Sequence, residues 1–341
     1  MLKNKNENNF EKYLEVMTDD VGIFQHSKFG VPDRNFGYTT DDNARALILA
    51  VMLYEESKKE KYLKLICLYL SFVHHALDSD GMFKNFMTYQ RDFIDEKGSE
   101  DCYGRCVWAL GRTMASKQVP KNIRTTCQFI INSAKKNLEL LVSPRAKAYA
   151  IVGLSYMKPS KDILNSIENL SEALVVQFDK YKDKNWKWFE NSITYGNAFF
   201  PWALLRAYKI LGKKSYLETA KTSMDFLEGI VLKPGYFKPI GSNGWLVKGS
   251  EAALFDEQPI EACEMLYTSM EYYEISKDKK YLKIAKKCYG WYFGENSKKL
   301  SLIDEVTGAC HDGINEAGIN LNQGSESIVA YGMAVLKMRQ L

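Results

Sequence analysis

Two adjacent aspartates, Asp41 and Asp42, stand at the start of an apolar segment in the stretch YTTDDNARALILA, which runs from Tyr38 to Ala50. The apolar residues that follow are typical of a buried helix, and Thr39 or Thr40 is a suitable N-cap. Acidic residues in the first turn gain about 0.3–1 kcal/mol each from the helix dipole. The same two carboxylates could instead act as an acid and a base in catalysis. Other carboxylates along the chain help to decide between helix stabilisation and catalysis.

Further carboxylates stand at similar positions along the chain. Glu100 and Asp101 begin a second segment of this kind, Asp256 and Glu257 begin another, and Glu326 begins the last. Carboxylates that converge on one cavity repel each other, so helix dipoles alone are a poor reason to collect them. We therefore predict one acidic cavity, and its catalytic candidates are Asp41, Asp42, Glu100, Asp101 and Glu257.

Paired carboxylates perform glycoside hydrolysis, in which one is the acid and the other is the base or nucleophile. The two tasks need different pKa values, which a helix N-terminus, a neighbouring charge and burial can provide. Adjacent residues such as Asp41 and Asp42 can place their carboxyl groups about 5–5.5 Å apart, the separation of a retaining mechanism. An inverting mechanism needs a wider pair, such as one of these aspartates with Glu100 or Glu257 across the cavity.

Aromatic and basic residues near these segments are candidates for holding a sugar, because Trp and Tyr stack on the C–H faces of sugar rings. The cluster NWKWFEN at 185–191 precedes one such segment. Arginines nearby can orient sugar hydroxyls or pair with the acids, and both roles remain open. The substrate-binding candidates are Arg34, Tyr38, Arg45, Arg105, Trp188, Glu190, Tyr195, Trp245, Asp256, His311, Asp312 and Glu326.

The stretch at 38–50 is the first of six helical segments rich in Ala, Gly and aromatic residues. The other five lie at 98–112, 143–156, 191–208, 256–273 and 322–338. Amphipathic segments alternate with them, at 8–17, 60–77, 122–141, 161–181, 215–231 and 280–296. This alternation predicts an all-α (α/α)6 toroid in a single domain, 1–341, with a helical solenoid as the competing arrangement. The inner helices are expected to begin near residues 41, 100, 144, 193, 257 and 324.

The connections between these segments differ in length. Links from the small-residue helix to the amphipathic helix are short, whereas most links in the other direction are long. The long links are 19–38, 79–98, 182–191, 232–256 and 295–322. Long structured loops in a compact domain are usually functional. In a toroid they all meet at the mouth where the inner helices begin, which is also where the carboxylates stand.

The composition indicates which binding partners are disfavoured and in which cellular compartment the protein is expected. The net charge of +4 is thinly spread, which disfavours binding to nucleic acid or a membrane surface. A polar N-terminus without an apolar core and seven scattered cysteines predict a cytoplasmic protein with reduced thiols. Cys102 and Cys106 share a helix face but lack a second ligand pair. We find no phosphate-binding loop, dinucleotide fingerprint or nucleophile elbow, and we expect neither metal nor other cofactor.

The segment TDDNARAL resembles the DDNA segment of glycoside hydrolase family 76, the endo-α-1,6-mannanases. That resemblance implies an (α/α)6 fold with Asp41 as nucleophile and Asp42 as acid/base. A broader resemblance covers most of the chain. The segments YTTDDNARALI, GSEDCYGRCVWALG, FDEQPIEA and GACHDGI are similar to an (α/α)6 module of bacterial carbohydrate-active proteins. It implies the same fold and a sugar substrate.

Three functions follow from these features. The first is a glycoside hydrolase for an oligosaccharide, for example a mannoside. The second is a glycoside phosphorylase or a sugar epimerase on the same toroid. Phosphorolysis requires a basic phosphate pocket, and an epimerase usually has histidines in its cavity, whereas this chain has only four. The third is a non-catalytic glycan-binding module. The oligomeric state stays open.

Overall fold

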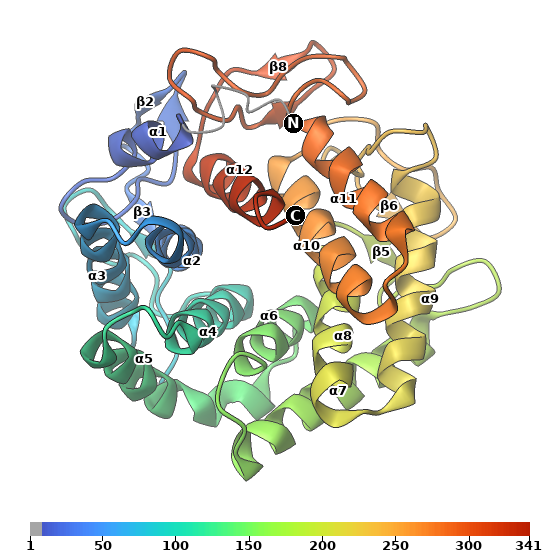
Figure 1. The fold of residues 1–341 in the computed structure, drawn as a ribbon, viewed down its shortest axis with the longest axis horizontal. Helices are drawn as coiled ribbons and strands as arrows, with labels where there is room; N and C mark the ends of the chain where they lie inside the picture. The colour runs from blue at the N-terminus through green and yellow to red at the C-terminus, as the bar shows by residue number, and fades with distance from the viewer. Residues whose placement is uncertain (1–8) are drawn as a thin grey trace.

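The helices form two concentric rings in the computed structural model, which describes residues 9–341 (Figure 1). Within those residues there are twelve α-helices. The inner ring consists of α2 (Thr40–Ser57), α4 (Glu100–Ala115), α6 (Pro144–Leu154), α8 (Phe199–Leu211), α10 (Pro259–Ser276) and α12 (Ser325–Met338). The outer ring consists of α1 (Phe10–Val16), α3 (Glu60–Ala76), α5 (Lys121–Ala134), α7 (Lys161–Tyr181), α9 (Lys214–Val231) and α11 (Lys279–Trp291). A short 3-10 helix, η2 (Lys135–Leu140), extends α5.

The inner ring is closed. Each inner helix packs against the next one along the chain, and α12 packs against both α10 and α2. The first outer helix, α1, covers α12, so the two ends of the chain complete one hairpin of the ring. Closure confirms the predicted (α/α)6 toroid and excludes the open solenoid.

The inner helices begin close to the expected residues, with one clear exception. Five of them start within two residues of the predicted positions. The exception is α8, which was expected near residue 193 and begins at Phe199. Ser192–Ile193 instead form strand β5, and Gly196 has a positive φ of 63° in the turn that follows. The expected first helix at 8–17 is observed as α1, while its residue 8 lies outside the described part of the chain.

Short antiparallel strand pairs fasten the long loops at the mouth where the inner helices begin. Each strand has two residues. The pairs are β1 (Ser27–Lys28) with β2 (Val31–Pro32), β3 (Tyr38–Thr39) with β4 (Phe86–Met87), β5 (Ser192–Ile193) with β6 (Leu246–Val247), and β7 (Gly313–Ile314) with β8 (Ile319–Asn320). Because β3 runs directly into α2, its pairing with β4 fixes where the two aspartates begin their helix.

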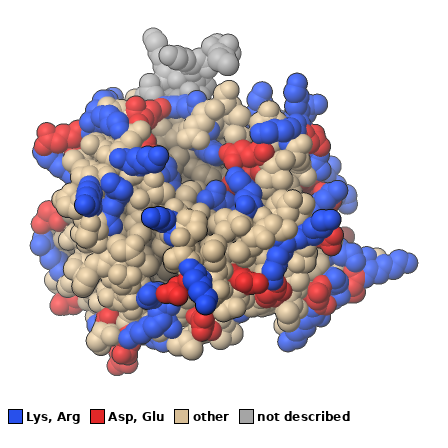
Figure 2. Space-filling model, turned by 60° about the horizontal axis from the view of Figure 1, so that its bottom comes forward, with Lys and Arg blue, Asp and Glu red and all other residues tan. Residues whose placement is uncertain are grey.

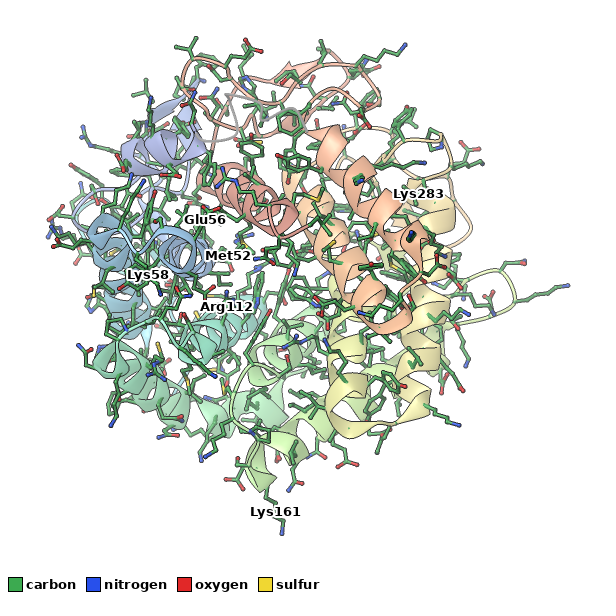
Figure 3. The ribbon with its side chains drawn as sticks, in the orientation of Figure 1. Met52, Glu56, Lys58, Arg112, Lys161 and Lys283 are labelled. Carbon is green, nitrogen blue, oxygen red and sulfur yellow. The ribbon has the colours of Figure 1, made fainter. Side chains whose placement is uncertain are left out.

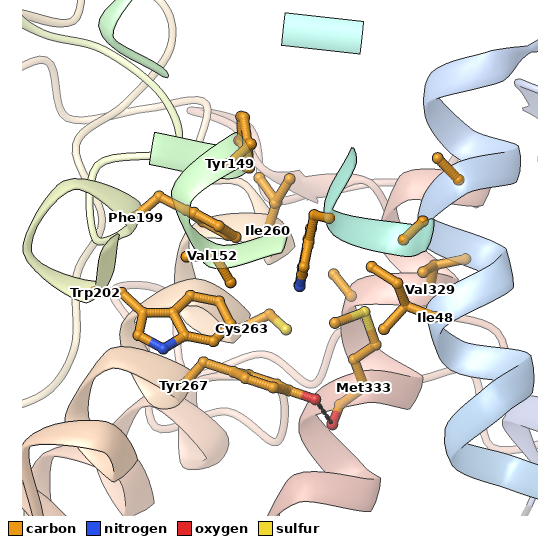
Figure 4. Close-up of a cluster of buried hydrophobic side chains, with 14 of the residues drawn as sticks. Ile48, Tyr149, Val152, Phe199, Trp202, Ile260, Cys263, Tyr267, Val329 and Met333 are labelled. Carbon is orange, nitrogen blue, oxygen red and sulfur yellow. Dashed lines mark hydrogen bonds between the residues drawn. The ribbon is translucent and has the colours of Figure 1, made fainter. Parts of the chain in front are cut away.

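Apolar side chains from the inner helices fill the middle of the ring, including Ile48, Val152, Phe199, Cys263 and Met333 (Figure 4). On the outer surface, Lys and Arg side chains alternate with Asp and Glu over the face drawn in Figure 2. In the described residues no helix is both long and apolar enough to cross a bilayer.

Glycines allow α4 and α6 to approach closely. Gly111 and Gly153 face each other, and a methyl group at either position would strike the backbone of the other helix. A Cβ at Gly153 would come within 2.5 Å of the carbonyl oxygen of Val107 and 2.6 Å of the amide nitrogen of Trp108. Backbone atoms cannot yield as a flexible side chain can, so this crossing requires glycine.

We predict that Gly153→Ala lowers the free energy of unfolding by about 1–3 kcal/mol, because it overpacks a helix crossing. The matched control is Gly229→Ala in α9, where a Cβ would meet no described atom within 4 Å. That change should be neutral or stabilising by up to about 1 kcal/mol. Urea unfolding of both variants measures the difference, and equal stabilities would contradict the observed packing.

Candidate active site

A cavity of about 460 Å³ opens at the mouth of the ring where the inner helices begin. Its volume lies within the range of about 300–1,000 Å³ that is common for small-molecule sites. Loops and helix starts from both ends of the chain line it. Five carboxylates contribute, from Asp41, Asp42, Asp256, Asp312 and Glu326. The other polar side chains include Arg45, His26, Gln25, Asn85, Gln258 and Asn320.

Arg45 connects three of these carboxylates. Its Nη2 lies 3.1 Å from Oδ2 of Asp41 and 3.1 Å from Oδ1 of Asp42, one helical turn back on α2. Its Nη1 lies 2.6 Å from Oε2 of Glu326 in the first turn of α12. The guanidinium is almost fully buried, so these ion pairs are much less screened than surface pairs. Arg45 therefore joins the first and last inner helices at the cavity.

Asp41 has a second cationic partner behind it. Nη1 of Arg105, on α4, lies 2.9 and 2.8 Å from its two carboxylate oxygens. Burial alone would raise the pKa of Asp41, but the charges of Arg105 and Arg45 outweigh burial and lower its pKa below the usual value. Asp41 is thus held ionised, and its side chain keeps 17% of its surface exposed.

Asp42 is in a different environment, although it is the next residue. Thr39 caps α2 by accepting the amide hydrogen of Asp42, and its hydroxyl donates to Oδ2 of the same residue over 2.6 Å. Burial is the largest influence and raises the pKa of Asp42; Arg45 opposes it, and the negative charge of Asp41 adds to it. The net pKa is raised. The two neighbours therefore have opposite shifts, one towards the ionised form and one towards the protonated form.

A third carboxylate, Asp312, faces the same cavity from the loop before α12. Its Oδ1 accepts hydrogen bonds from the amide of Gly324 at 2.6 Å and the hydroxyl of Ser327 at 2.7 Å. Burial raises its pKa, although these two bonds and the nearby His26 act in the opposite direction. His26 also lines the cavity, where its ring lies edge-on to Phe36 at 4.8 Å.

The expectation that five catalytic candidates share this cavity needs correction, because only Asp41 and Asp42 among them line it. Glu100 accepts hydrogen bonds from the backbone amides of residues 142 and 143 and fastens the loop before α6. Asp101 accepts hydrogen bonds from the hydroxyls of Ser143 and Tyr195. Glu257 is buried against Nε1 of Trp291, at 2.8 Å, and the hydroxyl of Ser297. These three carboxylates stabilise loops.

Four of the predicted substrate-binding residues do line the cavity: Arg45, Asp256, Asp312 and Glu326. Arg105 supports Asp41 from behind, which is the acid-pairing role that the sequence left open. Tyr38 is buried, donates to Oδ2 of Asp19 over 2.6 Å and does not line the cavity.

The remaining predicted binding residues lie elsewhere. Trp188 is fully buried, edge-on to Phe189 and Phe200, which corrects its assignment as a sugar platform. The other five residues also do not line the cavity: Arg34, Glu190, Tyr195, Trp245 and His311. Arg34 stacks on Tyr89, and Glu190 pairs with Arg145. Tyr195 packs near Trp245, and His311 lies beside Gln323.

Two buried glutamates on the inner face of α10 were not anticipated. Glu264 accepts a hydrogen bond from the hydroxyl of Tyr149 at 3.4 Å, and that hydroxyl also contacts Nη2 of Arg105 at 3.1 Å. Burial raises the pKa of Glu264 well above its usual value, and the nearby Glu261 raises it further. A polar chain thus leads from Asp41 into the wall of the ring. The spacing of glutamates in PIEACEML was the available signal, because i and i+3 share one helix face.

No protein-family model and no curated protein matches this sequence. Solved structures match along almost the whole chain. A sugar epimerase from a ruminal bacterium is similar with a TM-score of 0.75 and 13% identity, covering 98% of this chain and 97% of its own. A D-mannose isomerase has a TM-score of 0.70 and 14% identity, and the match covers 99% of this chain and 100% of the isomerase. The family 76 α-mannanase of Bacteroides thetaiotaomicron has a TM-score of 0.68 and 12% identity, and the match covers 98% of this chain and 96% of the mannanase. The (α/α)6 fold is therefore shared with all three.

The ion pair between Arg105 and Asp41 yields a prediction about stability. Arg105→Met should lower the free energy of unfolding by about 3–5 kcal/mol at neutral pH, because it leaves Asp41 as a buried charge with one partner fewer. The folded pKa of Asp41 is depressed, so its contribution is present above the unfolded pKa of about 3.9 and is lost as pH falls through the folded pKa. The cost of the substitution should therefore shrink in acid.

The matched control for that experiment is Arg91→Met, which removes an exposed ion pair of 2.8 Å to Asp20. A surface pair contributes at most about 1 kcal/mol. Denaturant unfolding at several pH values compares the two variants. Equal losses for both, or a loss at Arg105 that grows in acid, would contradict the account of Asp41.

Proposed function

We propose that the protein is a glycoside hydrolase that cleaves a short oligosaccharide, for example a mannoside, with Asp41 and Asp42 as its catalytic pair. The observation that carries this proposal is the opposite pKa shift of two adjacent carboxylates in one polar cavity. Glycoside hydrolysis needs one carboxylate that is ionised and one that holds a proton at working pH.

The geometry suits a retaining reaction. One Nη2 atom of Arg45 lies 3.1 Å from an oxygen of each aspartate, so those oxygens are separated by no more than twice that distance. This bound is compatible with the ~5–5.5 Å of retaining enzymes. Asp41, the more exposed and ionised, would attack the anomeric carbon. Asp42 would protonate the departing glycosidic oxygen and then remove a proton from the water that releases the sugar.

The substrate class has separate support. The cavity wall offers carboxylates and side-chain amides, which are suitable partners for sugar hydroxyls. The DDNA segment and the likeness to a family 76 α-mannanase favour a mannoside. A phosphorylase is less well supported, because Arg45 and Arg105 already pair with carboxylates instead of forming a phosphate pocket. A pure binding module would favour aromatic platforms, whereas Phe86 is the aromatic residue among those lining this cavity.

A sugar epimerase or isomerase is the second candidate. Two observations favour it: a sugar epimerase and a D-mannose isomerase have higher TM-scores than the mannanase, and His26 lines the cavity close to Asp312. Such an enzyme moves a proton at a sugar carbon, whereas a hydrolase separates two sugars. Incubation in D2O distinguishes them, because epimerisation or isomerisation incorporates deuterium into the product and hydrolysis increases the number of reducing ends.

The first catalytic prediction concerns the two aspartates. Asp41→Asn and Asp42→Asn should each lower kcat by several orders of magnitude, because one removes the nucleophile and the other removes the proton donor. Turnover is measured on a substrate found by screening manno- and gluco-oligosaccharides. Glu60→Gln is the matched control, since Glu60 is also a first-turn acid but is exposed on the outer helix α3. Thermal melts check folding, and full activity in both asparagine variants would remove this pair from consideration.

The second catalytic prediction concerns pH. Activity requires Asp41 ionised and Asp42 protonated, so kcat/KM should fall in acid as the lowered pKa of Asp41 is reached and fall at higher pH as the raised pKa of Asp42 is passed. Arg105→Met removes a cation from Asp41 and should move the acid limb upward. A profile whose acid limb stays in place in this variant would separate Asp41 from catalysis.

A further inference from the structure

A second cavity, of about 220 Å³, lies at the opposite end of the ring, where the inner helices end. It shares no lining residue with the first cavity. On α2, for example, Arg45 lines the first cavity while Ile48 and Met52 line the second. Cys263 and Val152 belong to the buried apolar cluster of Figure 4 and line neither cavity. A ligand in the second cavity is therefore separate from the sugar in the first.

Cations from three different helices converge on this second cavity. Arg112 comes from α4, Arg206 from α8 and Lys337 from α12. Figure 3 labels Arg112 of α4 and Met52 of α2, which both line this cavity. The two guanidiniums lie over the ring of Tyr156, at 5.8 Å for Arg112 and 4.4 Å for Arg206. Tyr156 thus holds both arginines at one side of the cavity.

The carboxylates nearby are already paired. Glu55 receives two hydrogen bonds from Arg112. Glu271 lies 2.6 Å from Nζ of Lys209 and 3.6 Å from Nη1 of Arg206. Glu274 lies 3.1 Å from the same lysine nitrogen. The residues that line the cavity therefore include three cations, Arg112, Arg206 and Lys337, and two carboxylates, Glu271 and Glu274. The ion pair of Lys337, 4.0 Å from Glu274, is the longest that these cations make.

Lys337 has only distant partners: its Nζ lies 5.7 Å from the centroid of the Tyr267 ring and forms one long ion pair. Only 19% of its side chain is exposed, and its nearest carboxylate, Glu274, is 4.0 Å away. No hydrogen bond from its ammonium to another described residue is seen. Burial lowers the pKa of Lys337, and the neighbouring charges of Arg112 and Arg206 lower it further, while Glu274 and Glu271 oppose them. An ammonium group carries three donors, so this position lacks an acceptor.

We propose that the second cavity binds a small oxyanion, a phosphate or carboxylate group, through Lys337 with Arg112 and Arg206 beside it. An oxyanion supplies the missing acceptor and balances the surplus charge. The buried rings of Trp202 and Tyr267 also line the cavity, whose volume of about 220 Å³ suits a compact group. Binding there would bring together α4, α8 and α12, and the other end of α12 carries Glu326 and Ser327 of the acidic cavity.

The test uses the full chain with two probes, inorganic phosphate and malonate, titrated by calorimetry at constant ionic strength. Both contain oxyanions, and their relative affinities distinguish a phosphate site from a carboxylate site. Glycerol is the uncharged control. Wild-type protein should bind one of the anions saturably, and Lys337→Met should weaken that binding at least about tenfold, because one charge-assisted contact is lost. The control Arg91→Met should leave it unchanged.

Thermal melts give an independent readout. Without anion, Lys337→Met should melt at the same or a higher temperature than wild type, because it removes a buried cation that lacks a close partner. With anion, the melting temperature should rise for wild type and not for the variant. Lys337→Gln provides the same comparison if the methionine variant does not fold. Absence of saturable binding by wild type, or equal binding by wild type and both Lys337 variants, would overturn the proposal and leave Lys337 as a helix-terminal charge.

Discussion

The buried ion pairs of Arg45 are the interaction on which the site depends. A single guanidinium binds two neighbouring carboxylates on α2 and a third on α12, so the acidic mouth is assembled where the ring closes. Without that cation, the carboxylates would repel each other in a buried setting. Arg105 adds a second cation to only one of them, Asp41. The resulting asymmetry shifts the pKa values of two chemically identical side chains in opposite directions.

The toroid explains why charges gather at both ends. Each hairpin contributes one inner helix in the same direction, so six helix starts meet at one mouth and six helix ends at the other. Acidic residues are favoured at helix starts and cations at helix ends. The long loops add Asp256, Asp312 and His26 to the acidic mouth. At the other mouth, Arg112 and Lys337 lie in the last turns of their helices.

Much of the architecture could be predicted from the sequence, because the alternation of small-residue and amphipathic helices has few closed solutions. The start of α8 was missed because Ser192–Ile193 pair with a distant segment, which local patterning does not reveal. Asp41 and Asp42 were placed correctly at the mouth, since a capped helix start fixes their position. Whether an acid at such a start faces the axis or a loop depends on the rotation of the helix, at about 100° per residue. That is why Glu100 was misplaced, whereas Glu257 was misplaced because it precedes α10 and pairs with Ile314 in a loop.

The most direct test of this account is a carboxyl 13C NMR titration of the two aspartates, assigned with the single asparagine variants. The account predicts that Asp41 titrates below the ordinary aspartate pKa of about 3.9 and that Asp42 titrates above it. If the order is reversed, or if both carboxyls titrate together at the ordinary value, Arg45 and Arg105 do not divide the pair into a base and an acid. The proposed division of catalytic work would then be contradicted.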